Sequence, residues 1–130
     1  MERINTGTIQ LTWDFPSRLA ELRFESETYL MGKDAAVLAD ALKLWIGKDG
    51  RPFGMLVDGA RLSGVDAEFR SVGAAFFRAH REDSCVAAFN MSPILRVIVD
   101  MFRVGTGMRL KAFASESAAR AWLQKMGIPA

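Results

Sequence analysis

The sequence has few of the residues on which common chemical sites depend. Its 130 residues include one cysteine and one histidine. A single cysteine excludes an intrachain disulfide, and a lone histidine without a cysteine cluster leaves no ligand set for zinc. The sequence also has no Gly-x-Ser-x-Gly segment that would place a nucleophilic serine on a sharp turn. We therefore expect no catalytic residue, no metal and no cofactor.

Long hydrophobic runs and a leader segment are missing as well. The longest apolar stretch, residues 94–104, is interrupted by three charged residues, whereas a membrane span needs about 20 apolar residues. The first residues, Met1 to Asn5, contain no apolar core of a signal peptide. We expect a cytoplasmic protein with no membrane span. Cys85, inside the apolar run 85–89, is then expected to be a small buried hydrophobe.

Charge is nearly balanced and hydrophobic residues are plentiful. The 17 basic and 15 acidic residues leave a net charge of +2, which gives no reason to expect a nucleic-acid partner. Half of the residues are hydrophobic, so the chain is expected to fold. Its length predicts a single domain over residues 1–130, since domains usually have about 100–200 residues.

Alternating apolar and polar residues predict two half-buried strands near the N-terminus. Over residues 9–15 and 20–24 every second residue is apolar, which is the period of a strand with one wet face. Pro16-Ser17 lies between them and is typical of a turn. The two strands are therefore expected to form an antiparallel hairpin, with a short extended piece after it at residues 28–31.

The rest of the chain alternates between expected strands and helices. Continuous apolar runs at 53–57 and 85–89 are typical of strands covered on both faces. The alternation at 108–113 predicts a last strand at or near a sheet edge. Apolar stripes at helical spacing predict four helices, whose expected N-caps are Asp34, Asp66, Ser92 and Ser115.

This order predicts an α/β fold with a mixed, mostly parallel sheet, led by the N-terminal antiparallel hairpin and decorated by about four helices. Ligands of such sheets usually bind beyond the carboxyl ends of the strands. That rule selects the segment from Gly59 to Val65, expected to be a loop, with its flanking residues, and the segment 90–93. The candidate residues for binding a partner or ligand are Asp58, Arg61, Ser63, Asp66, Glu68, Arg70, Asn90 and Ser92.

These candidates have both structural and functional interpretations. Arg70 is expected one turn into its helix, where it could brace the loop by pairing with Asp58 or Asp66, or form part of a polar recognition site. Ser92 could only cap its helix, or that helix could also offer free backbone N–H groups to an anion. The sequence leaves both choices open.

Several local strings resemble STAS (sulphate transporter and anti-sigma-factor antagonist) domains, specifically the small SpoIIAA-like bacterial proteins. The resemblance covers about residues 8–125 and lies at strand ends and helix starts. Its pieces are Met55-Leu56-Val57-Asp58, Gly64-Val65-Asp66, Ser92-Pro93 and the stretch from Phe113 through Trp122-Leu123. The resemblance implies a SpoIIAA-like fold and a regulatory protein partner.

The phosphorylation motif of this family is changed here. In the phosphorylatable antagonists an apolar-Asp-Ser-Ser-Gly segment carries the serine that receives phosphate from a partner kinase. The same stretch here reads Val65-Asp66-Ala67-Glu68-Phe69. Asp66 matches, but Ala67 and Glu68 stand in place of the two serines, the second of which receives the phosphate, and Phe69 stands in place of the glycine. Ala67 has no hydroxyl, so the switch is lost here. Glu68 either imitates the phosphate as a fixed charge or only complements the helix dipole.

Three classes of function remain. The first is a non-catalytic protein-interaction module of STAS type. The alternative is a small-molecule or lipid-binding protein with an apolar pocket near the strand carboxyl ends, lined by helix 94–102 and by aromatics among Trp45, Phe76, Phe77 and Trp122. The third, an enzyme, would need a general base, and Asp58 and Asp66 are the only strand-end carboxylates.

The expected helix over residues 92–104 is apolar nearly all round. Such a helix is either deeply buried or contacts the sheet on one side and a partner on the other. A homodimer through this helix is therefore a further prediction.

Overall fold

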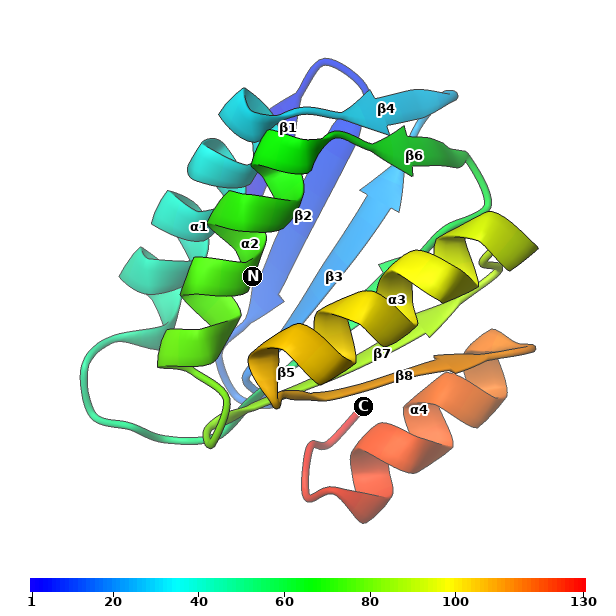
Figure 1. Cartoon of the computed structure of the whole chain (residues 1–130). Helices are drawn as coiled ribbons and strands as arrows, with labels where there is room; N and C mark the ends of the chain where they lie inside the picture. The colour runs from blue at the N-terminus through cyan, green and yellow to red at the C-terminus, as the bar shows by residue number, and fades with distance from the viewer.

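A computed structural model describes residues 1–130 of the chain. Its strands are β1 (Glu2–Thr6), β2 (Ile9–Asp14), β3 (Leu19–Phe24), β4 (Thr28–Leu30), β5 (Phe53–Asp58), β6 (Leu62–Val65), β7 (Ser84–Phe89) and β8 (Arg109–Phe113). Its helices are α1 (Gly32–Ile46), α2 (Ala67–Ala79), α3 (Pro93–Thr106) and α4 (Glu116–Lys125). Figure 1 shows these elements in place.

The main sheet has six strands in the order β1-β2-β3-β5-β7-β8. Strands β1, β2 and β3 are antiparallel, and the pairs β3-β5, β5-β7 and β7-β8 are parallel. The predicted fold class is confirmed, as are the β2-β3 hairpin and the position of β8 at an edge. Strand β1 was not predicted. Four of its five residues are exposed, so it carries no alternation of apolar and polar residues.

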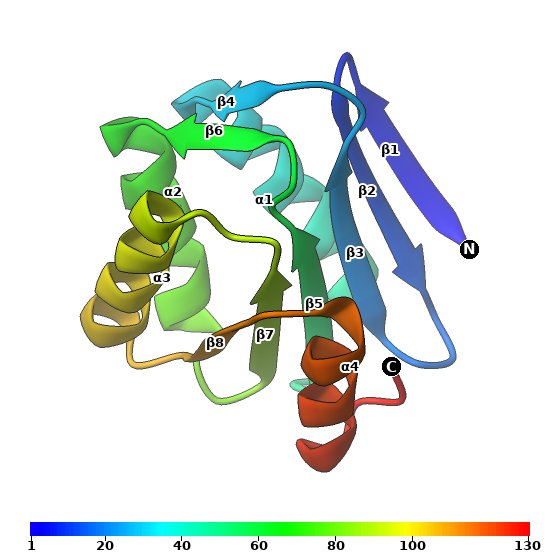
Figure 2. The same cartoon turned by 90° about the vertical axis from the view of Figure 1, so that its right-hand side faces the viewer.

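The helices cover the two faces of the sheet unequally. Helices α1, α2 and α3 lie on one face, and α4 lies alone on the other (Figure 2). The larger core, beneath the three helices, includes the inward side chains of β2 at Ile9, Leu11 and Trp13. The smaller core lies beneath α4. Every residue of β7 is buried, which explains its continuous apolar sequence.

A second sheet consists of β4 and β6, which pair in parallel. Strand β6 lies within the segment from Gly59 to Val65, so the prediction that this segment is a loop was wrong. Strand β6 has only four residues, of mixed burial, and its pairing partner lies more than thirty residues earlier. Neither feature leaves a periodic signal in the sequence.

Three of the four expected N-caps are confirmed. The side chains of Asp66, Ser92 and Ser115 accept hydrogen bonds from backbone N–H groups of the first helical turn, at 2.6, 3.2 and 3.2 Å. The prediction for Asp34 was wrong, because α1 begins at Gly32 and Met31 is its N-cap. The Asp34 carboxylate instead accepts from the Met31 backbone N–H at 2.8 Å, as an acidic residue at the third helical position can.

Of the two alternatives for the apolar helix α3, the structure excludes deep burial. Only Leu95 and Thr106 are buried along its 14 residues. The helix lies at the border of the molecule (Figure 2), where it packs against α2 and β8. It can therefore bury only one side, and its other apolar residues remain at the surface.

Ser84 at the start of β7 provides a test of the packing. Its side chain is fully buried and its hydroxyl has no hydrogen-bond partner, an arrangement that costs free energy. We expect Ser84→Ala to raise the free energy of unfolding by about 1 kcal/mol in chemical denaturation. The matched control, Ser26→Ala at an exposed position, should change it by less than about 0.5 kcal/mol. A clear loss of stability in Ser84→Ala would contradict this assignment.

Candidate functional site

The carboxyl ends of β5 and β7 form one rim of the sheet. These strands pair in parallel so that Asp58 lies opposite Phe89, and the segments that follow them meet. The Gly59 N–H donates to the Phe89 carbonyl at 2.9 Å, and the Asn90 side-chain amide donates to Asp58 Oδ1 at 3.1 Å. A Cβ at Gly59 would lie 2.6 Å from Met91 Sδ. A side chain at position 59 would therefore require the Met91 side chain to move where the two segments cross.

A network of charged side chains braces this rim on the α4 face. Arg23 on β3 is its centre: Nη1 lies 3.2 Å from Asp58 Oδ2, and Nη2 lies 3.0 Å from Glu21 Oε1 and 3.4 Å from Glu116 Oε2. Arg120 on α4 pairs with the same Glu21 and Glu116, each at 2.9 Å. The network thus ties β3, β5 and α4 together.

The pKa of Arg23 reflects this position. Partial burial by itself lowers the pKa of the guanidinium, but the hydrogen bond to Glu21 and the charges of Glu116, Glu21 and Asp58 raise it above its ordinary value. The neighbouring carboxylates thus favour the charged form of Arg23. The guanidinium also lies over the Phe89 ring, 5.9 Å from its centre, a favourable cation–π contact.

Sequence reasoning missed this network. Asp58 does take part in an ion pair, but its partner is Arg23 and not Arg70. The structure gives Arg70 no side-chain ion pair or hydrogen bond, and this residue lies in a shallow groove between α2 and α3 that Arg78 also lines. Glu21 and Arg23 alternate on the wet face of their strand, which marked them as surface residues only. Nothing in the spacing linked them to α4, about a hundred residues away.

Other candidates hold the backbone of the second sheet and the helix starts. The Ser63 hydroxyl donates to the Thr28 carbonyl at 3.0 Å, and the Arg61 guanidinium donates to the Glu25 carbonyl. Asp66 and Ser92 cap α2 and α3. Each of these four side chains therefore has a structural partner within the chain.

Glu68 and its surroundings differ because they face outward. Ala67 and Glu68 begin α2 and are exposed. Two apolar side chains nearby are also exposed, Tyr29 by 54% and Met31 by 40%. The Tyr29 ring lies over Gly64 and the Glu68 side chain lies over Gly32, since a Cβ at these glycines would meet them at 3.0 and 2.2 Å. We call Tyr29, Met31, Ala67 and Glu68 the α2 entry surface.

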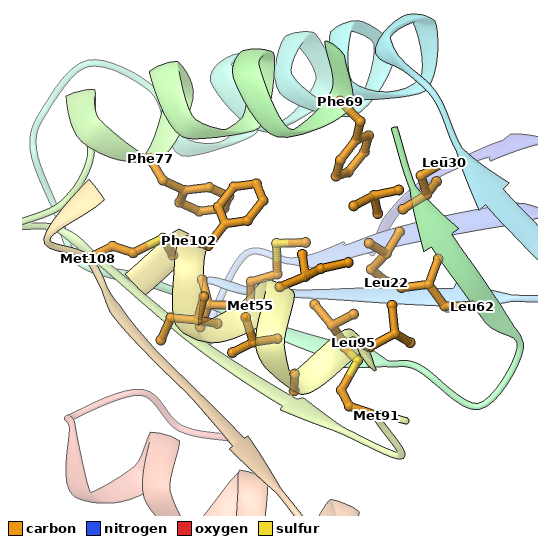
Figure 3. A pocket seen from close by; sticks show the side chains of 17 residues that line it. Leu22, Leu30, Met55, Leu62, Phe69, Phe77, Met91, Leu95, Phe102 and Met108 are labelled. Carbon is orange, nitrogen blue, oxygen red and sulfur yellow. The ribbon is translucent and has the colours of Figure 1, made fainter. Parts of the chain in front are cut away.

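An apolar cavity of about 130 Å³ lies between the sheet and helices α2 and α3. All 17 lining residues are hydrophobic, and Figure 3 shows their side chains pointing toward a common space. Val57, Ala88 and Met91 bring one end of the cavity to the strand carboxyl ends. Of the four aromatics expected to line a pocket, only Phe77 lines this cavity.

The remaining reactive side chains lie elsewhere. Burial raises the pKa of the Cys85 thiol to about 11, although the charge of Arg109 acts in the opposite direction. A thiol with this pKa is protonated at neutral pH and is a poor nucleophile. His80 packs against Phe76, and its Nδ1 lies 3.2 Å from Asp83 Oδ2. No three His, Cys, Asp or Glu side chains come together in a group that could hold a metal ion.

Comparison with solved structures identifies the class of fold. The chain is similar over 94% of its length to 90% of an uncharacterised DUF3478-family protein with a SpoIIAA-like fold from Shewanella loihica, with a TM-score of 0.63 and 14% identity. Over 90% of its length it is similar to 98% of an anti-sigma-factor antagonist (STAS) domain protein from Planctomyces limnophilus, with a TM-score of 0.62 and 13% identity. The chain therefore has a SpoIIAA-like STAS fold, as the sequence predicted.

A third similar structure is a chain of the Pseudomonas aeruginosa complex between the diguanylate cyclase SiaD and its activator SiaC. The match covers 88% of this chain and all of that one, with a TM-score of 0.60 and 8% identity. No protein-family model and no curated protein matches the sequence. None of the four helices is both long and apolar enough to cross a membrane.

The charged network at the rim leads to a stability prediction. Arg23→Met removes the one cation that contacts Asp58 and leaves Glu21 and Glu116 with Arg120 alone. We expect it to lower the free energy of unfolding by about 1–2 kcal/mol, as loss of a partly buried shared ion pair does. The matched control is Arg51→Met, which removes an exposed pair with Asp49 and should cost less than about 0.5 kcal/mol. Equal losses in urea titrations of the two variants would contradict the bracing role.

Proposed function

We propose that this chain is a cytoplasmic, non-catalytic regulatory module of STAS type that acts by binding another protein. The observation that carries the proposal is the α2 entry surface. It lies where the STAS resemblance places the phosphorylated serine, and it combines exposed Tyr29 and Met31 with the charge of Glu68. Tyrosine and methionine are enriched in protein interfaces. This mixture of apolar area and one fixed charge suits a protein contact.

The structural neighbours support a regulatory role. They include SpoIIAA, an anti-sigma factor antagonist, and a complex in which SiaC is the activator of a diguanylate cyclase. Both descriptions concern proteins that act through another protein. We infer that this chain uses the same fold for the same kind of task, with a partner of its own.

Ala67 and Glu68 replace both serines of the family motif, and the loss of these hydroxyls gives this module a fixed state. A phosphorylatable antagonist changes its charge at the second serine of the motif, whereas this chain has the carboxylate of Glu68 at that position. In this proposal the partner contacts Glu68 directly, and phosphorylation at this position does not regulate binding.

The strand-end carboxylates favour a non-catalytic role over an enzymatic one. Asp58 is held by Arg23 and Asn90, and Asp66 by the first turn of α2. The cavity beside them has only hydrophobic lining residues. A general base needs access to a substrate proton, and these two carboxylates have structural partners instead.

Site-specific photo-crosslinking in cells that naturally make the protein tests this proposal. Tyr29 is replaced by the photoreactive residue p-benzoyl-phenylalanine, which preserves an aromatic ring. We expect covalent adducts with a specific protein, and we expect Glu68→Arg to reduce their yield about tenfold, because reversing an interface charge opposes complementarity.

The matched control places the same photoreactive residue at Leu44, which is 80% exposed on α1. Equal adduct patterns at positions 29 and 44 would refute the proposal. An adduct at position 29 that consists only of a second copy of the chain would also refute it, since the α2 entry surface would then serve self-association.

The apolar cavity favours a second candidate function, the binding of a small apolar molecule or a short acyl chain. Its volume of about 130 Å³ is close to that of an engineered apolar cavity of about 150 Å³ that binds benzene. One end of the cavity reaches Met91 at the strand carboxyl ends (Figure 3). The polar head group of a bound acyl chain would lie at this end, against the polar rim of the sheet.

Methyl NMR with labelled methionines tests this candidate, because Met55, Met91 and Met108 line the cavity. Hexanoate should shift these three signals saturably and leave the signal of exposed Met1 unchanged. Ala88→Leu fills the cavity and should abolish the shifts, whereas Ala36→Leu on the exposed side of α1 should not. Absence of saturable shifts in the unmodified protein would exclude this function for short acyl chains.

A further inference from the structure

Strand β8 is an open edge of the main sheet that lies between two helices. It pairs only with β7, and α3 lies beside it on one face of the sheet while α4 lies beside it on the other (Figure 1 and Figure 2). No loop or side chain of the structure forms a hydrogen bond with its backbone. The N–H and C=O groups on its outer side are therefore unpaired, and an extended segment of another chain can bind to such groups.

A groove of about 520 Å³ follows this edge. Residues 108–112 form its floor, α3 contributes Arg96, Asp100 and Arg103, and α4 contributes Trp122. Since α3 and α4 cover opposite faces of the sheet, a groove that touches both helices must pass across the open edge of β8. The groove is thus a space beside the strand, where a further strand would lie.

The groove is strongly basic. Four of its nine lining residues are cationic and only Asp100 is acidic. Asp100 already pairs with Arg103 at 3.2 Å, and the Arg109 guanidinium donates to the carbonyls of Glu82 and Ser84. The other two cations, on α3 and on β8, have no ion pair within the chain. Carboxylates that would balance their charge must come from another molecule.

The two sides of the edge differ in chemistry. Phe113 packs against the core beneath α4, so Lys111, two residues earlier, points to the same side. Its ammonium lies 5.5 Å from the centre of the Phe113 ring, and the Trp122 ring lies 5.5 Å from that ring as well. The α3 side carries Arg96 and Arg103. An added strand alternates its side chains between the two sides. Carboxylates suit the side of the two arginines, and apolar or aromatic side chains suit the side of Trp122.

Other occupants of the groove fit less well. A second copy of β8 would bring Arg109 and Lys111 of the two chains together, and like charges oppose strand pairing. The phosphates of a single-stranded nucleic acid would match the cations, but they would also face the backbone carbonyl oxygens of the edge. A strand with carboxylates supplies both donors and acceptors to the edge and negative charge to the cations.

From these observations we propose that β8 binds an extended acidic segment of another protein, which joins the main sheet as an additional strand. Acidic side chains alternate in this segment with apolar or aromatic ones, the acidic ones facing Arg96 and Arg103 and the others facing Trp122. The groove shares no residue with the α2 entry surface. The inference therefore goes beyond the proposed function and does not depend on it.

Selection from a library of random peptides displayed on phage tests this proposal, with the unmodified full chain as the target. We expect the selected peptides to carry Asp or Glu at every second position, and synthetic copies to bind saturably. Arg96→Glu and Lys111→Glu should each weaken this binding about tenfold, because reversing a charge opposes complementarity. The matched control, Arg3→Glu on the exposed edge strand β1, should change it by less than about twofold.

Three results of the selection would overturn the proposal. They are the recovery of no binding peptide, the recovery of peptides without enrichment in carboxylates, and equal losses of affinity in Arg96→Glu and Arg3→Glu. The last result would show that acidic peptides bind the chain at some other place.

Amide hydrogen exchange followed by NMR separates strand addition from attraction between charges alone. A bound peptide should slow exchange of the outward N–H groups within Arg109–Phe113 about tenfold or more, since they gain hydrogen-bond acceptors. The amides of Glu2–Thr6 should not change. Oligothymidylate, a polyanion without peptide groups, should not slow exchange in β8. Peptide binding that leaves the β8 amides unprotected, or equal protection by oligothymidylate, would contradict the added strand.

Discussion

The parallel pairing of β5 with β7 in the middle of the sheet is the constraint on which the rest of the structure depends. All of β7 and most of β5 are buried, so their side chains are apolar except for Ser84 and Asp58 at two of their ends, and the strands must keep one register. That register brings Asp58 opposite Phe89 and joins the two segments of the rim. The same strands provide the floor of the apolar cavity on one face and the contact with α4 on the other.

Ion pairs hold the structure together where no helix covers the sheet. Helix α4 is alone on its face, and it does not reach over β1 and β2. Arg23 on β3 and Arg120 on α4 lie at the border between the part of that face covered by α4 and the part exposed to solvent. Both arginines pair with Glu21 and with Glu116. Because several carboxylates share each cation, removing one partner changes more than one pair. The rim that carries Asp58 is therefore fixed by side chains that come from three separate elements.

The parts of the fold that could be predicted are those whose signal is local. Alternation over residues 9–15, the buried run 85–89 and the capping residues Asp66 and Ser92 each identify an element from neighbouring residues alone. Strand β6 and the partner of Asp58 could not be found in this way, because both depend on contacts between distant parts of the chain. The sequence left deep burial of α3 and an uncovered apolar face as alternatives for a related reason: an apolar sequence does not reveal how much surface its neighbours can cover. The residues of the α2 entry surface outside the motif, Tyr29 and Met31, gave no functional signal at all.

The two edge strands of the main sheet both carry charged side chains. The outer strands are β1, with Glu2 and Arg3, and β8, with Arg109 and Lys111. Unpaired backbone groups on such strands attract further strands from other molecules, and charged side chains oppose that addition by mutual repulsion and hydration. Fibril-like stacking of the sheet is thereby disfavoured at both ends.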